Sequence, residues 1–334
     1  MTTVTAFSVK PYDRATLEAA MAGLDDPPEF TWIESRLGVE TAQLAAGSDI
    51  VCAFVNDDLS APVLEVLAAG GTRAIALRCA GFNNVDLDAA AMLDLRVMRV
   101  PAYSPNAVAE HTLALILALN RKIHRAHNRV RDGNFRLDGL VGFDLAGTTA
   151  AVVGTGRIGG IVARLLWHLR CEVLAVDEWH DPHLVELGVE YTTWEDALDR
   201  ARIITLNCPL TEDTHHLIDA DAIASMQPGV MLVNTGRGPL IDTDAVVQGL
   251  KDGHIGALAL DVYEEEEDLF FEDRSAEILY DDTFARLLTF HNVLITAHQA
   301  FLTDEALAAI ASTTLDNIAA VRAGEPSENE VMAA

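Results

Sequence analysis

Residues 150–159, AAVVGTGRIG, contain Gly154, Gly156 and Gly159 in the spacing GxGxxG. An apolar run precedes the glycines, an amphipathic segment follows them, and Asp177 ends the next apolar run, EVLAVD. In a strand–turn–helix unit the first glycine permits a tight turn, the second lets the backbone approach a pyrophosphate, and the third lets the helix pack on the strand. The stretch therefore predicts a dinucleotide-binding unit.

The carboxylate at the end of EVLAVD indicates which dinucleotide is bound. Asp177 can accept hydrogen bonds from ribose hydroxyls, whereas its charge would repel the 2′-phosphate of NADP. The pyrophosphate is expected at the N-terminus of the following helix, because the free N–H groups there favour anions. Arg157 and Ile158 belong to this turn and are expected to contact it. NAD is therefore the predicted cofactor.

Apolar runs alternate with amphipathic stretches on both sides of this motif, which predicts parallel sheets covered by helices on both faces. With 334 residues the chain is long enough for two such domains. We expect an α/β protein of two doubly wound domains. Residues 1–102 with 299–334 would form a flavodoxin-like substrate domain, and residues 103–298 a Rossmann NAD-binding domain. Residues 107–130 are expected to form one long helix.

The composition excludes several classes of partner. The chain has 51 acidic and 23 basic residues, a formal net charge of −28, so nucleic acid and anionic membranes are not expected to bind it. Neither a secretory signal nor an apolar run long enough to cross a bilayer is visible, which favours a cytoplasmic location. We hypothesise that so acidic and lysine-poor a surface belongs to a salty cytoplasm.

No metal site is predicted. The four cysteines are scattered without a CxxC pair, so free thiols are expected at Cys52, Cys79, Cys171 and Cys208. The histidine pairs His180 with His183 and His215 with His216 have no acidic or thiol ligand patterned around them. Surface histidines are the simpler interpretation.

Three further strand ends carry side chains suited to the reduction of a 2-keto acid. Arg237 follows VMLVN between two glycines, the run EEEE at 264–267 follows ALALDV, and His298 follows VLITA. The carboxyl ends of parallel strands meet at one edge of a sheet, where ligands bind. An arginine binds a carboxylate, an imidazole can protonate a forming alkoxide, and a glutamate can hold that imidazole protonated.

Eight motifs spread over the whole length carry a resemblance: FSVKPYD, VCAFVNDD, RCAGFNNVD, RVPAYSPNAVAEH, VVGTGRIG, NTGRG, DVYEEEEDLFFED and HQAF. They resemble the D-isomer-specific 2-hydroxyacid dehydrogenases, and the acidic-aromatic stretch is typical of the lactate branch. The resemblance implies an NAD-dependent, reversible reduction of pyruvate to D-lactate. It assigns Arg237 as the clamp on the substrate, His298 as the general acid and Glu266 as the carboxylate paired with the histidine.

The resemblance also implies the surroundings of these three residues. Glu264, Glu265 and Glu267 would be mostly solvated. The substrate would be contacted by the backbone of a small-residue loop, by a residue in an interdomain cleft and by aromatic walls that favour a methyl group: Cys79, Ala80, Gly81, Tyr103, Phe54 and Phe301. Further cofactor contacts would come from Cys208, Pro209, Thr235 and, near the nicotinamide, Asp261.

Two positions depart from the family, and two other functions stay open. Serine is common at the position of Gly236, and glycine at that of Ala297, so cofactor affinity does not follow from the resemblance. The same scaffold could reduce hydroxypyruvate, phenylpyruvate or a branched 2-keto acid. An NADH-sensing, corepressor-like binding protein is the second alternative, which the acidic charge and the short C-terminal segment disfavour. By family inference, the helix after Pro105 helps to form a homodimer.

Overall fold

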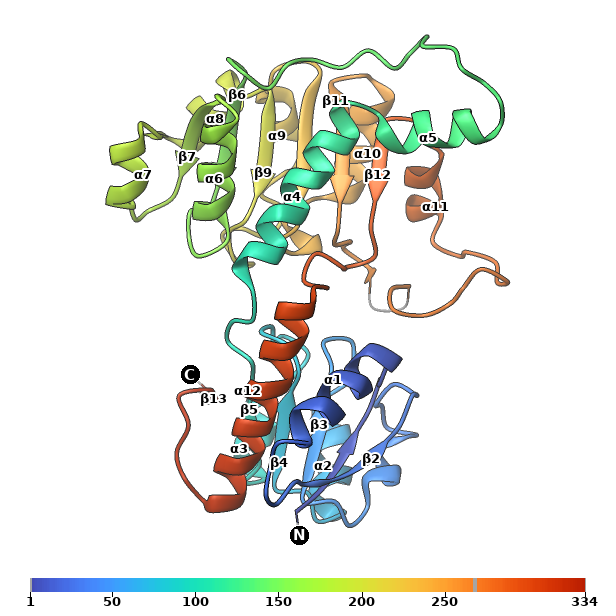
Figure 1. Cartoon of the computed structure of the whole chain (residues 1–334), viewed down its shortest axis with the longest axis vertical. Helices are drawn as coiled ribbons and strands as arrows, with labels where there is room; N and C mark the ends of the chain where they lie inside the picture. Colours follow the sequence, from blue (N-terminus) through green and yellow to red (C-terminus); the bar gives the residue numbers. More distant parts are fainter. Residues whose placement is uncertain (1, 267–268, 334) are drawn as a thin grey trace. The chain divides into compact units, whose positions relative to one another are not determined.

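The structure is a computed structural model that describes residues 2–266 and 269–333. The chain divides into two compact units (Figure 1). Unit 1 comprises Met1–Ser104 and Leu302–Ala334, and unit 2 comprises Pro105–Phe301. Among the described residues, no helix has both the length and the apolar character needed to cross a membrane.

Unit 1 is built on a six-stranded sheet in the order β13-β5-β4-β3-β1-β2. All neighbours pair in parallel except β13, which is antiparallel to β5. The parallel strands thus follow the flavodoxin-like order, as predicted. The elements are β1 (Thr3–Ala6), α1 (Pro11–Met21), β2 (Glu29–Trp32), the 3-10 helix η1 (Ala42–Ala45), β3 (Ile50–Ala53), α2 (Ala61–Ala69), β4 (Ala74–Leu77), α3 (Leu87–Met92), β5 (Arg96–Met98), α12 (Asp304–Ala323) and β13 (Glu330–Val331).

The strands of unit 1 are apolar on both faces, because each face is covered by helices. In β3, Val51 and Ala53 pack in the core formed with α2 and α3. Ile50 and Cys52 belong to the opposite core, with α1 and α12. Successive side chains of a strand point to opposite faces, so a continuous apolar run fills both cores.

Unit 2 has a seven-stranded sheet in the order β12-β11-β10-β9-β6-β7-β8, and every pairing is parallel. The order reverses between β6 and β9, which is the Rossmann arrangement. The elements are α4 (Pro105–Asn120), α5 (Ile123–Arg131), β6 (Thr149–Val153), α6 (Gly159–His168), β7 (Glu172–Val176), α7 (Pro182–Leu187), β8 (Glu190–Tyr191), α8 (Trp194–Arg200), β9 (Ile203–Leu206), α9 (Ala220–Ser225), β10 (Val230–Asn234), the 3-10 helix η2 (Gly238–Leu240), α10 (Thr243–Lys251), β11 (Ile255–Leu260), α11 (Asp282–Thr289) and β12 (Val293–Ile295).

Helices cover both faces of this sheet (Figure 1). In β6, Ala150 and Val152 pack in the core shared with α4, α6 and α7. Ala151 and Val153 pack in the other core, with α8, α9 and α10. Several helices begin at an Asp or Thr whose side chain accepts a hydrogen bond from the first turn, which stabilises the start; these are Asp181, Thr193, Asp219, Asp242 and Asp281.

The single long helix expected over residues 107–130 is wrong, because the chain breaks into α4 and α5. Lys122 adopts a left-handed conformation (φ 51°, ψ 38°) at the break. The buried Asn120 ends α4, and its side-chain amide exchanges two hydrogen bonds with the backbone of Phe143, at 2.7 and 2.9 Å. None of the residues of α5 is buried within the chain.

Candidate active site

The glycine turn after β6 is shaped by close backbone contacts. Gly154 has φ +83°, and a Cβ there would lie 2.6 Å from the nitrogen of Cys208. A Cβ on Gly159 would lie 1.8 Å from the carbonyl oxygen of Gly154. A Cβ on Gly156 would meet no atom within 4 Å among the described residues. Any side chain at Gly154 or Gly159 would therefore clash with backbone atoms, whereas Gly156 has open space beside its backbone.

Asp177 directly follows β7 and faces this turn. Its Oδ2 accepts hydrogen bonds from the backbone N–H of Thr155 (2.6 Å) and from the Thr155 hydroxyl (3.2 Å). Its Oδ1 accepts one from the N–H of Trp179, at 3.0 Å. Burial works against ionisation, but these hydrogen bonds outweigh it and hold the pKa of Asp177 below 3.8. The side chain is thus an ionised acceptor at the strand end.

Arg237 lies on a short loop that follows β10, and Asn234 holds this loop. The fully buried Asn234 accepts a hydrogen bond from the N–H of Gly236 (3.0 Å) and donates one to the carbonyl oxygen of Arg237 (2.7 Å). The half-buried guanidinium of Arg237 donates to the carbonyl oxygen of Gly236, at 2.8 Å. A Cβ on Gly238 would lie 2.1 Å from the carbonyl oxygen of Tyr263. This loop therefore packs directly on the segment after β11.

His298 and Glu266 form a hydrogen-bonded pair. The Nδ1 of His298 lies 2.7 Å from Oε1 of Glu266, and the two side chains are 18% and 20% exposed. The second oxygen of Glu266 accepts a hydrogen bond from the N–H of Tyr263, at 2.9 Å. His298 has φ +51°, a left-handed conformation that few non-glycine residues adopt. The structure thus brings together two of the residues that the sequence singles out.

The left-handed turn at His298 is held by Asp261, which is 1% exposed. The carboxylate accepts hydrogen bonds from the Thr296 hydroxyl (2.6 Å) and from the N–H groups of Gln299 and Ala300 (both 2.9 Å). The Nε2 of His111, on α4, lies 3.5 Å from the same carboxylate. Burial works against ionisation of Asp261, but these contacts outweigh it and hold its pKa below 3.8.

The sequence predicts that Glu266 alone, among the four consecutive glutamates, contacts a histidine and that the others are mostly solvated; for Glu264 this prediction is wrong. Glu264 is not mostly solvated: its Oε1 lies 2.6 Å from Nε2 of His216, and its Oε2 accepts a hydrogen bond from the Thr243 hydroxyl at 2.8 Å. Glu265 is exposed, as predicted. Glu267 lies outside the described residues. Of the three described carboxylates in this run, those of Glu264 and Glu266 therefore face a histidine.

The other predicted cofactor and wall residues of unit 2 are placed as follows. Thr235 is buried, and its hydroxyl lies 2.8 Å from that of Thr112. Cys208 is half-buried and borders the glycine turn, whereas Pro209 is exposed. Arg157 is exposed, Ile158 is half-buried and Phe301 is buried. Gly236 is closely packed, since a Cβ there would lie 3.2 Å from the side chain of Leu240.

In unit 1, the loop 79–81 follows β4. The Sγ of Cys79 donates to the carbonyl oxygen of Gly81 (3.2 Å), and Arg99 donates to the carbonyl oxygen of Ala80 (3.2 Å). Cys79 is buried, and Tyr103 is half-buried in the same unit. The loop is thus fixed by the side chain of Cys79 and by that of Arg99.

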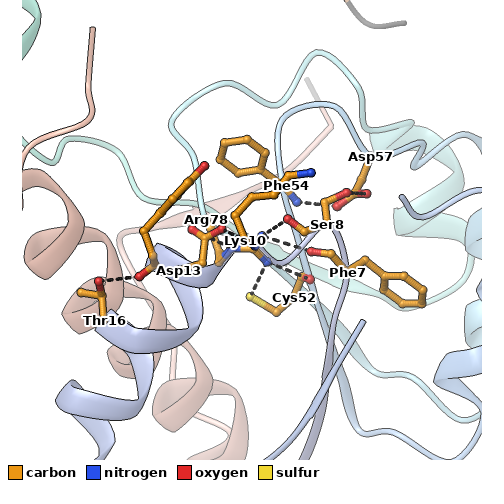
Figure 2. A network of polar contacts seen from close by, with 10 residues as sticks. Phe7, Ser8, Lys10, Asp13, Thr16, Cys52, Phe54, Asp57 and Arg78 are labelled. Atoms are coloured by element: carbon orange, nitrogen blue, oxygen red, sulfur yellow. Dashed lines mark hydrogen bonds and ion pairs between the residues drawn. The ribbon is translucent and has the colours of Figure 1, made fainter. Parts of the chain in front are cut away.

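Arg78 directly precedes this loop in the sequence and is 1% exposed. Figure 2 shows its polar contacts. Its guanidinium donates to the carbonyl oxygens of Phe7 (3.1 Å) and Cys52 (3.4 Å), and its Nε lies 3.8 Å from Oδ1 of Asp13. It also lies over the ring of the buried Phe54, 5.5 Å from the centroid. A single buried cation therefore connects the ends of β1 and β3 with the start of α1.

The comparison with known proteins assigns the family. Residues 113–300 match the model of the D-isomer specific 2-hydroxyacid dehydrogenase, NAD binding domain. The chain belongs to the D-isomer-specific 2-hydroxyacid dehydrogenase family. It is 50% identical to a 2-hydroxyacid dehydrogenase homolog of Haemophilus influenzae over 98% of this chain and 99% of that protein. It is 49% identical to the D-lactate dehydrogenase of Escherichia coli, over 98% of each chain.

Solved structures agree with this family assignment. The apo-structure of D-lactate dehydrogenase from Escherichia coli has a TM-score of 0.90 and 46% identity, covering 99% of this chain and 100% of that one. D-lactate dehydrogenase from Aquifex aeolicus, complexed with NAD and lactic acid, has a TM-score of 0.86 and 32% identity, covering 99% of each chain. The predicted fold class is confirmed for both units.

As a 2-hydroxyacid dehydrogenase, the protein uses NAD, and unit 2 contains its NAD-binding domain. The residues present fit this cofactor. The backbone at Gly156 has open space beside it for a pyrophosphate, and the ionised Asp177 can accept hydrogen bonds from a ribose. Among the described residues, no three histidine, cysteine or acidic side chains gather to hold a metal.

Sequence reasoning missed several residues that support this 2-hydroxyacid dehydrogenase site. Asn234 and Arg78 carried a visible signal, because each is a polar residue directly at the end of an apolar strand run. His111 and the pair of His216 with Glu264 carried none, since their partners are far apart in the sequence. Cys52, Cys79 and Cys171 are buried, Cys208 is half-buried, and none of the four forms a disulfide.

Proposed function

We propose that the protein is an NAD-dependent D-lactate dehydrogenase that reversibly reduces pyruvate to D-lactate. The observation that carries the proposal is the hydrogen-bonded pair of His298 and Glu266, 2.7 Å apart. The pair and the loop of Arg237 follow β12, β11 and β10, which are neighbours in one parallel sheet. In such sheets ligands bind beyond the carboxyl ends of the strands.

His298 is the proton donor in this mechanism. Because its Nδ1 faces Glu266, that nitrogen carries a hydrogen, and Nε2 is the atom that faces the substrate oxygen. In reduction, Nε2 donates its proton to the forming alkoxide, and in oxidation it accepts that proton. Glu266 stabilises the imidazolium and fixes the ring. When bound, NADH supplies the hydride that C2 of the keto acid receives.

Arg237 binds the substrate's carboxylate and the carbonyl oxygen beside it. Its planar guanidinium presents parallel N–H groups that match two oxygens. The hydrogen bonds of Asn234 to the backbone of Gly236 and Arg237 fix the position from which the arginine side chain extends. A developing negative charge on the carbonyl oxygen is stabilised by a cation that is already in place.

We propose that the residues 79–81 of unit 1, the substrate domain, bind the substrate carboxylate through backbone N–H groups. Tyr103 would contact the substrate, and Phe54 and Phe301 would enclose its methyl group. The support is that the loop is short, small and fixed, and that the ring of Phe54 is held under Arg78.

We further propose that the cofactor contacts come from Gly154, Gly156, Arg157, Ile158, Gly159, Asp177, Cys208, Pro209, Thr235 and Asp261. The glycines and Asp177 form the turn and the ribose acceptor described above. The carboxylate of Asp261 already accepts hydrogen bonds from Gln299 and Ala300. Asp261 would therefore act on the nicotinamide by holding the loop of His298.

The proposed function is tested by measuring NADH oxidation near neutral pH with pyruvate, hydroxypyruvate and phenylpyruvate in parallel. We expect the highest kcat/KM with pyruvate, and D-lactate as the product when its chirality is read with stereospecific enzymes. A preference for a larger keto acid would retain the mechanism and refute the choice of substrate. Binding of NADH without turnover would support the corepressor-like alternative.

We also propose that the protein forms a homodimer through α5 and the segment after it. None of the residues of α5 is buried within the chain. Large apolar side chains are exposed there: Ile123, Val130, Phe135, Leu137 and Val141. Exposed apolar groups of this kind mark interaction surfaces. Sedimentation equilibrium should give twice the chain mass, and Phe135→Ser with Val141→Ser should shift it toward the monomer.

We also propose a cytoplasmic location. Free cysteines persist in reducing compartments. Fractionation of cells of the source organism should recover the enzyme with cytoplasmic markers, and recovery with secreted proteins would refute the proposal.

A further inference from the structure

The run of four glutamates contains a second histidine–carboxylate pair, formed by His216 and Glu264. The Nε2 of His216 lies 2.6 Å from Oε1 of Glu264, whose other oxygen accepts hydrogen bonds from the hydroxyl (2.8 Å) and the N–H (3.2 Å) of Thr243. The side chain of Glu264 is 22% exposed and that of His216 34% exposed. Burial works against ionisation, but these contacts outweigh it and hold the pKa of Glu264 below 4.5.

His216 connects this pair to the loop of Arg237. Its backbone N–H donates to the carbonyl oxygen of Pro239 (2.8 Å), which lies in η2 directly after the loop. Ile218 continues this contact, with its N–H on the carbonyl oxygen of Leu240 at 3.0 Å. His216 adopts φ +52°, so its backbone turns sharply between the two contacts. The backbone of His216 therefore contacts the segment directly after the Arg237 loop, and its ring contacts Glu264 in the glutamate run.

Glu264 connects the same pair to Glu266. Tyr263 directly precedes Glu264; its N–H donates to Glu266, and its carbonyl oxygen lies against Gly238. A displacement of Glu264 would therefore move the turn that presents Glu266 to His298. The exposed Glu265 lies between them and makes no hydrogen bond or ion pair among the described residues.

We infer that His216 and Glu264 are positioning residues that hold the Arg237 loop and the Glu266 turn in one arrangement. Neither residue acts on the substrate in this inference, which rests on the proposed function. The physical reason is that two catalytic groups on separate loops need a fixed distance. A mutation far from the reacting atoms that misplaces a catalytic group by about 1 Å can reduce a rate roughly 100-fold.

The test compares three variants that each change one polar side chain. Glu264→Gln removes the charge but keeps an oxygen for Thr243. His216→Asn removes the ring but tolerates the left-handed backbone, which asparagine adopts more readily than most residues. Glu265→Gln is the matched control, because it removes the same charge from the neighbouring exposed position. The readouts are kcat and KM for pyruvate, the Kd of NADH, the pH profile of reduction and thermal unfolding.

We expect Glu264→Gln and His216→Asn to lower kcat about 10-fold or more, within the range that misplacement of about 1 Å produces. The pH profile of reduction should differ from that of the Glu265→Gln control, because the turn that presents Glu266 to His298 is held less well. The Kd of NADH should change less than about twofold, and Glu265→Gln should match the unchanged enzyme in all readouts. The double variant should be no worse than the worse single one, since the pair acts as a unit.

Two results would overturn the inference. In the first, both variants keep the kcat and pH profile of the Glu265→Gln control. In the second, they lower only the unfolding temperature, which would make the pair purely structural. If the unchanged enzyme itself does not reduce pyruvate, the proposed function fails, and the same variants then test the inference on whichever 2-keto acid is turned over.

Discussion

The pairing of His298 with Glu266 is the residue-level feature on which the proposed chemistry depends. An imidazole that donates from Nδ1 to a carboxylate has a fixed tautomer and a stabilised cation. The backbone at His298 is held in its left-handed conformation by hydrogen bonds from the following residues to Asp261. The orientation of one ring is thus set by two carboxylates with different tasks.

Replacing Glu266 with Gln should lower kcat for pyruvate reduction about 100-fold, near the lower end of what a positioned proton donor contributes. The pH profile should change as well, because the imidazole no longer faces a negative charge. The measurement is kcat and kcat/KM against pH, with the Kd of NADH as the control. An unchanged profile would transfer the role to another carboxylate.

Replacing Asp261 with Asn should destabilise the fold by about 2 kcal/mol at neutral pH, since a buried N–H that loses its acceptor costs roughly 1–3 kcal/mol. The pKa of Asp261 is lower in the folded chain than its ordinary value of 3.8. Its charged form therefore contributes stability above pH 3.8 that is lost as the pH falls through the folded pKa. Urea unfolding should show the two proteins converging in acid; a constant difference would contradict the assignment.

At the level of elements, the turns after β6 and β10 contain glycines that contact neighbouring backbone at Gly154, Gly159 and Gly238. The strand and helix runs around β6, β7, β10 and β11 could be predicted from apolar periodicity. The strands β8 and β13 could not, because two residues give no usable period, and β2 could not, because its side chains are at least partly exposed and form no continuous apolar run. The pairing of His216 with Glu264 depends on a left-handed backbone and on a partner 48 residues away, neither of which a local pattern reports.

Gly238 offers a direct test of the contact between two loops. Gly238→Ala should destabilise the protein by about 1–3 kcal/mol, the usual cost of forcing an extra group into a packed site, because the Cβ would lie 2.1 Å from the Tyr263 carbonyl oxygen. It should also lower kcat, since the loops of Arg237 and Glu266 must separate. Gly23→Ala, where a Cβ meets nothing within 4 Å of the described residues, is the control. Equal stability of both variants would refute the contact.

At the scale of the whole molecule, a net charge of −28 is the dominant electrostatic property. Like charges repel one another in a compact chain, and salt screens this repulsion over about 10 Å at 0.1 M and about 3 Å at 1 M. The α/β fold class of both units could be predicted from the sequence pattern, whereas the effect of this charge on stability depends on the solvent.

Molar KCl should therefore raise the unfolding temperature by several degrees, about what 1 kcal/mol produces in domains of this size. Differential scanning calorimetry between 0.1 and 2 M KCl measures it. Sodium sulfate at equal ionic strength is the comparison, because it screens the charges similarly but is also excluded from the protein surface, which itself raises stability. A fall in the unfolding temperature with KCl would refute the hypothesis of adaptation to salt.

The return of α12 to unit 1 has a consequence for biosynthesis. Ala311, Leu315 and Ile318 of this helix complete the core that contains Val4 and Ile50. A chain emerging from the ribosome thus exposes the part of its first sheet that α12 covers until nearly all of it has been translated. Unit 2, by contrast, is continuous in sequence. The half made first therefore matures last, and chaperones have a long interval in which to meet its apolar surface.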